Sequence, residues 1–100
     1  DKIAILNGKG AQILFLRGNK PNLQIDLPNA ARIQKLVWYR DNEHIFVQYP
    51  DRVAFLDLID TELKNFETVA NTAKMEYEPS ANTLYFLKDN TLQQLIFPSS

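Results

Sequence analysis

Short runs of apolar residues alternate with polar ones along the whole chain, and turn-forming residues separate the runs. The stretch 23–27 alternates most regularly, as expected of a strand with one buried and one exposed face. The pattern as a whole predicts ten short strands, over residues 2–7, 11–17, 23–27, 33–39, 44–49, 52–58, 65–70, 73–78, 83–87 and 91–97. We therefore expect an all-β fold.

The turns between these runs are short. Gly8-Lys9-Gly10 joins the first two runs, and a three-residue connection that contains glycine is typical of a β-hairpin. Pro21 and Pro28 flank the third run, which indicates an edge strand because proline has no backbone donor for a neighbour. Arg40-Asp41-Asn42-Glu43 and Pro50-Asp51 have the composition of tight turns. The chain should fold as consecutive antiparallel meanders.

The meander pattern recurs along the chain. Shifts of 39 and 42 positions superpose its parts without a gap: Trp38 on Tyr77, 45–47 on 84–86, 56–58 on 95–97, and 3–5 on 45–47. A period near 40 residues with about four strands per unit is the spacing of β-propeller blades. The alternative is chance similarity, because any all-β chain alternates apolar residues and turns at short intervals.

The segments 36–47, 51–58 and 75–97 resemble the propeller repeats of bacterial WD-like and TolB-like proteins, and especially the blades of some PEGA-domain proteins. Each reads as a strand that ends in an aromatic residue, a polar turn, a second strand, a tight turn and a third strand. The Gly-His and Trp-Asp pairs of the stricter WD repeat are missing. The resemblance implies a binding or scaffolding surface without catalysis and favours an extracytoplasmic bacterial location. It transfers no functional residue.

The predicted strands amount to about two and a half blades, whereas closed propellers have about four to eight. A full blade would occupy residues 31–71, between partial blades at 1–30 and 72–98. Open blade ends invite pairing. We therefore expect either a piece of a longer propeller or copies that assemble, with another protein or a second copy of the chain as the partner.

One segment also fits a helix. Leu63, Phe66, Ala70 and Ala73 recur at helical spacing behind Asp60, which is a preferred N-cap residue. A helix near 60–73 would make the fold α+β and the chain a small domain that binds a ligand or a protein. The repeat instead requires an outer strand over 65–70, and we favour that strand.

Charge and composition exclude several classes of protein. Eleven basic and twelve acidic residues leave a net charge of −1. The nearest basic group, Arg32, Lys35 and Arg40, lies beside Asp41 and Glu43, so we expect no nucleic-acid binding. No apolar run approaches the roughly 18 residues of a membrane span, so we expect no membrane insertion. The absence of cysteine excludes disulfides and thiolate metal sites.

Candidate catalytic residues are few. His44 is the only histidine, and its place after a turn predicts an exposed residue at the start of a strand, although Asp41 and Glu43 are near enough to pair with it. Asp57 and Asp60 resemble a pair of acids, but their spacing near a strand end is typical of turn residues. We predict no enzyme activity and no catalytic, cofactor-binding or metal-binding residue.

Two further patterns also favour structural interpretations. Gly8-Lys9-Gly10 lacks the remaining residues of a phosphate-binding loop and lies between strands. Aromatic residues are numerous enough to suggest a stacking platform for bases or sugars, but their recurrence at equivalent places predicts packing between sheets instead. These aromatic residues are Trp38, Tyr39, Tyr49, Phe55, Tyr77, Tyr85 and Phe86.

Overall fold

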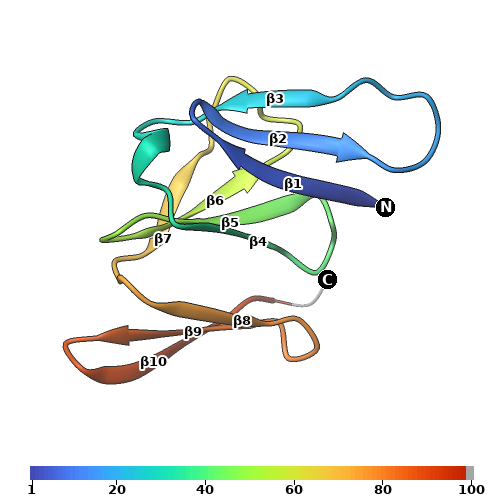
Figure 1. Ribbon diagram of the computed structural model, residues 1–100. Coiled ribbons are helices and arrows are strands. Elements are labelled where there is room, and N and C mark those ends of the chain that lie inside the picture. Colours follow the sequence, from blue (N-terminus) through green and yellow to red (C-terminus); the bar gives the residue numbers. More distant parts are fainter. Residues whose placement is uncertain (99–100) are drawn as a thin grey trace.

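The computed structural model describes residues 1–98 and contains three antiparallel sheets stacked in chain order (Figure 1). Sheet 1 consists of β1 (Lys2–Asn7), β2 (Gly10–Phe15) and β3 (Leu23–Asp26). Sheet 2 consists of β4 (Lys35–Trp38), β5 (His44–Gln48), β6 (Val53–Asp57) and β7 (Glu67–Ala70). Sheet 3 consists of β8 (Met75–Glu78), β9 (Thr83–Lys88) and β10 (Thr91–Ile96).

The predicted all-β class with consecutive antiparallel meanders is confirmed. Neighbouring strands in each sheet are consecutive in the chain, and β3 is an edge strand, as its flanking prolines indicate. A short 3₁₀ helix, η1 (Ala30–Arg32), which the sequence pattern did not predict, links sheets 1 and 2.

The alternative α+β fold is wrong. The segment 60–73 contains turns and the strand β7, and no α-helix occurs among residues 1–98. Asp60 accepts hydrogen bonds from the backbone amides of Lys64 and Asn65, so it organises a turn. Leu63 has a φ of 58°, a left-handed conformation that a right-handed helix cannot contain. The helical spacing of the apolar residues therefore arises from a turn followed by a strand.

One strand pair has the same register in all three sheets. Ile45 pairs with Leu56 in sheet 2. The pair 42 positions earlier in sheet 1 is Ile3 with Leu14, and the pair 39 positions later in sheet 3 is Leu84 with Leu95. Residues that align in the sequence thus occupy corresponding places in their sheets, and the face on which a residue lies can be compared between sheets.

Two apolar layers hold the stack together. Sheets 1 and 2 enclose one layer, in which Ile13 and Ile25 pack with Ile45 and Leu56. Sheets 2 and 3 enclose the other, in which Phe46 packs with Leu84. Successive residues of β5 point into opposite layers, because side chains alternate along a strand. Sheet 2 is therefore covered on both faces, whereas sheets 1 and 3 are each covered on one face.

Polar contacts also tie neighbouring sheets to each other. The hydroxyl of Tyr49 donates to the carbonyl of Pro28 at 2.6 Å, which joins sheet 2 to the segment after β3. The Lys35 ammonium donates to the carbonyl of Met75 at 3.1 Å, which joins β4 to β8. In both contacts a polar side chain donates to a backbone carbonyl of the neighbouring part of the stack, and the buried Tyr49 hydroxyl is satisfied in this way.

Candidate functional site

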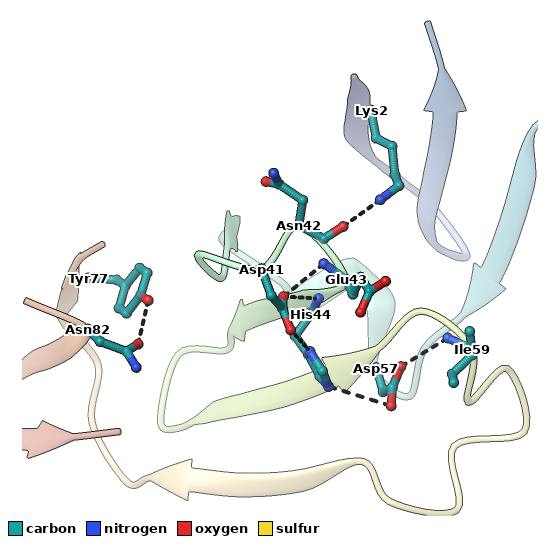
Figure 2. A network of polar contacts seen from close by, with 9 residues as sticks. All are labelled: Lys2, Asp41, Asn42, Glu43, His44, Asp57, Ile59, Tyr77 and Asn82. Atoms are coloured by element: carbon teal, nitrogen blue, oxygen red, sulfur yellow. Dashed lines mark hydrogen bonds and ion pairs between the residues drawn. The ribbon is translucent and has the colours of Figure 1, made fainter. Parts of the chain in front are cut away.

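His44 lies between two carboxylates at one end of sheet 2 (Figure 2). Its Nδ1 is 2.6 Å from the carboxylate of Asp41, and its Nε2 is 3.5 Å from that of Asp57. The ring also stacks on Phe55, with centroids 4.8 Å apart. His44, the first residue of β5, is therefore half-buried. The expectation that it is exposed is wrong, because the Phe55 ring and the two carboxylates cover it.

Asp41 is the organising residue of the turn between β4 and β5. One of its carboxylate oxygens accepts the backbone amides of Glu43 and His44, and the other faces the His44 ring. Burial alone would raise the pKa of Asp41, but the hydrogen bond from the Glu43 amide and the contacts with His44 outweigh burial, so the pKa lies below its usual value of 3.8. The ionised carboxylate is thus the form that holds the turn.

The His44 cluster has the geometry of a structural clamp. Both ring nitrogens face carboxylates, and the Oδ1 atom of Asp57 accepts the backbone amide of Ile59. The cluster therefore joins the turn before β5 to the end of β6. Asp60 takes no part, because its carboxylate accepts the amides of Lys64 and Asn65. The two acids that look like a pair in the sequence thus serve separate turns.

Sheet 3 has its own clamp at the corresponding end. The hydroxyl of Tyr77 donates to Oδ1 of Asn82 at 2.7 Å (Figure 2), and the Asn82 amide nitrogen donates to the carbonyl of Phe97. Burial raises the pKa of Tyr77, which keeps the phenol neutral and able to donate. Asn82 has a φ of 49°, a conformation that asparagine tolerates better than most residues.

Metal-binding and ligand-binding features are sparse. Residues 1–98 contain no cluster of three or more His, Cys, Asp or Glu side chains that could hold a metal ion. A pocket of about 370 Å³ is lined by Lys35 and Gln48 of sheet 2 and by Met75, Tyr85 and Leu92 of sheet 3, so it includes residues of the outer face of sheet 3. The Gln48 amide nitrogen donates to the carbonyls of Tyr49 and Thr72, so this side chain joins β5 to the connection between the two sheets.

The most distinctive surfaces are the outer faces of the two end sheets. Seven large apolar side chains in residues 1–98 are exposed, and six of them lie on these two faces. The seventh, Ile59, is in the turn after β6 and is 90% exposed. On sheet 1 the outer face carries Ile3, Ile5 and Leu16, and on sheet 3 it carries Leu87, Leu92 and Ile96. Each outer face therefore presents a group of exposed large apolar side chains.

Alternation along the strands assigns these residues to the outer faces. In β1, Ala4 and Leu6 pack into the layer shared with sheet 2, so Ile3 and Ile5 between them point away from it. In sheet 3, Leu92 pairs with Leu87 across β9 and β10, and Phe86, next to Leu87, packs toward sheet 2. No further sheet among residues 1–98 packs on either outer face, although Lys35 and Gln48 line a pocket together with Tyr85, Leu87 and Leu92 of sheet 3.

Most of the predicted packing aromatics lie in the two layers. Trp38 and Tyr49 contribute to the layer between sheets 1 and 2, and Tyr39, Phe55, Tyr77 and Phe86 to the layer between sheets 2 and 3. Tyr39 is the centre of the second group and stacks on Tyr77 with centroids 5.5 Å apart. Tyr85 belongs to neither layer, because it alternates with Leu84 and Phe86 and lies on the outer face of sheet 3.

Sequence reasoning did not single out the outer-face residues as a site. The signal that could have found them was present in the repeat: Ile3 and Ile5 align with Ile45 and Val47, which are fully buried. Ile3 and Ile5 are therefore apolar at positions that a neighbouring sheet covers elsewhere in the chain. Comparison with known proteins adds no relative, because no family model matches the chain and no curated protein or solved structure is significantly similar to it.

Among residues 1–98, no helix has the length and apolar character needed to cross a membrane.

Proposed function

We propose that this chain is a non-catalytic interaction or scaffold module built from propeller-like sheets, and that it associates with another copy of itself through its end sheets. The observation that carries the proposal is the pair of uncovered apolar faces at the two ends of the stack. Five of the six exposed large apolar side chains on these faces align with residues that are buried elsewhere in the same chain, and Ile96 aligns with the half-buried Asp57. Such faces lower their free energy when a further sheet covers them.

The geometry around the only histidine supports a role without catalysis. A general base needs a free nitrogen within hydrogen-bond reach of a reacting group. Both nitrogens of His44 instead face carboxylates of the same sheet, and the ring is stacked on Phe55. The cluster connects a turn to a neighbouring strand, and this is a structural role within the fold.

Sedimentation velocity over a dilution series tests self-association. We expect the wild-type chain at micromolar concentration to sediment faster than a monomer of 11.5 kDa and to dissociate on dilution. Leu92→Glu places a charge on the outer face of sheet 3 and should give the monomer at every concentration, because a charge buried at an apolar contact is costly.

Ile59→Glu is the matched control, since it introduces the same charge at an exposed apolar residue in a turn, away from both faces. It should leave the sedimentation of the wild type unchanged. A wild-type chain that remains monomeric throughout the series would overturn the proposal of self-association.

A further inference from the structure

The two contacts between neighbouring sheets use equivalent faces. The face of sheet 2 that packs on sheet 1 contains Ile45, Val47 and Leu56. The residues 39 positions later, Leu84, Phe86 and Leu95, form the face of sheet 3 that packs on sheet 2. In both contacts, therefore, the later sheet uses this one set of positions, which we call the leading face.

The earlier sheet uses the opposite set of positions in both contacts, and we call it the trailing face. In sheet 2 the trailing face includes Phe46 and Val53, which pack on sheet 3. The residues 42 positions earlier, Ala4 and Ala11, are in the face of sheet 1 that packs on sheet 2. Each contact in the stack thus joins a trailing face to a leading face.

The two uncovered faces are of opposite kinds. Ile3, Ile5 and Leu14 align with Ile45, Val47 and Leu56, so sheet 1 exposes a leading face. Tyr85 and Leu92 align with Phe46 and Val53, so sheet 3 exposes a trailing face.

The two faces are therefore the halves of the contact that already occurs twice within the chain. The sheet stack thus begins with a leading face and ends with a trailing face, at opposite ends of the molecule (Figure 1). The trailing face of sheet 3 also contains Glu76, Glu78 and Gln94 at the positions of Val37, Tyr39 and Phe55 in sheet 2.

We propose that two copies of this chain join head to tail, with the trailing face of sheet 3 of each copy packed on the leading face of sheet 1 of the other. This inference rests on the proposed self-association and specifies its geometry and copy number. Two copies contribute six sheets, within the range of about four to eight that closed propellers contain. Three copies would contribute nine.

A closed pair covers all four apolar faces with a single two-fold axis, whereas head-to-tail contacts that do not close give open filaments. A closed pair therefore leaves neither the face of sheet 1 nor the face of sheet 3 exposed to solvent. In the closed pair, Tyr85 and Leu92 of one copy lie against Ile3, Ile5 and Leu14 of the other.

Mixing two complementary variants tests the geometry. Ile5→Lys damages only the leading face, and Leu92→Glu damages only the trailing face. Both residues are exposed, at 42% and 67%, so neither substitution should prevent folding, and far-ultraviolet circular dichroism checks this. Each variant alone lacks one half of every head-to-tail contact and should be a monomer by native mass spectrometry. The mixture should form a one-to-one heterodimer, because it retains one intact contact.

The wild type should have a mass of about 23 kDa, twice that of one chain. A dimer that pairs like faces predicts a different result, since one of the two variants would then still dimerise alone and mixing would add nothing. That result, or a wild-type mass other than two copies, would overturn the head-to-tail pair and leave self-association standing. A monomeric wild type would overturn both.

Ile59→Lys and Ile59→Glu are the controls for the two added charges, and each should keep the wild-type mass.

Discussion

Asp41 shows how a single carboxylate can stabilise a sheet from a turn. It accepts two backbone amides and faces the His44 ring, which in turn approaches Asp57 on β6. The sequence predicted that residues 40–43 form a turn, and the structure agrees. The contact to Asp57 could not be predicted, because it depends on which strand lies beside β5 and on the side of the sheet that each residue faces.

The Asp41 clamp leads to a prediction about acid stability. We expect Asp41→Ala to lower the free energy of unfolding by about 1 kcal/mol at pH 7, because several hydrogen bonds are lost. The folded-state pKa lies below 3.8, so the stabilisation is present above that pH and is lost as the pH falls through the lowered value. Urea unfolding of the wild type and of Asp41→Ala at pH 7 and near pH 3 measures the difference in their free energy of unfolding.

The difference between the wild type and Asp41→Ala should therefore shrink in acid. Asp51→Ala, in the exposed turn before β6, serves as the control and should have little effect at either pH. A difference that stays constant down to pH 2 would contradict the assigned role of the carboxylate.

At the level of the elements, short apolar runs separated by turn residues located every strand. β5 lies in the sheet that is covered on both faces, so it reads as a continuous apolar run and not as an alternating one. The segment 60–73 was ambiguous because Leu63 and Phe66, at helical spacing, both pack against the first layer from a loop. The spacing of apolar residues carries no information about the left-handed conformation of Leu63. The pattern alone could therefore not exclude the helix.

The hairpin between β1 and β2 contains a glycine that the fold requires. Gly10 has a φ of 151°, and a Cβ atom there would lie 2.2 Å from the carbonyl oxygen of Ile25 and 2.7 Å from the amide of Leu27. We expect Gly10→Ala to lower the free energy of unfolding by about 2 kcal/mol or more, because β3 would have to move.

Gly8→Ala is the matched control for Gly10→Ala. A Cβ atom at Gly8 meets no other atom within 4 Å, so its effect should stay within about 0.5 kcal/mol. Chemical denaturation of both variants measures the difference, and equal effects would contradict the close packing of β3 against Gly10.

For the whole molecule, the stack of three sheets explains why the ends differ from the middle. Sheet 2 is covered on both faces, and β5 contains four buried residues of its five. Sheets 1 and 3 each retain one apolar face toward solvent. The sequence indicated open blade ends, because its strands make about two and a half units. It did not indicate that the two exposed faces are of opposite kinds, because this required knowing which face each sheet presents to its neighbour.

The uncovered faces are the centre of this account, and amide hydrogen exchange at two protein concentrations tests them most directly. Association should slow local opening wherever a face becomes covered. We predict that raising the concentration from nanomolar to tens of micromolar slows exchange in β1 and β2 of sheet 1 and in β9 and β10 of sheet 3 together, while β5 is protected at both concentrations. Exchange that is independent of concentration, or protection that develops in only one end sheet, would contradict the account.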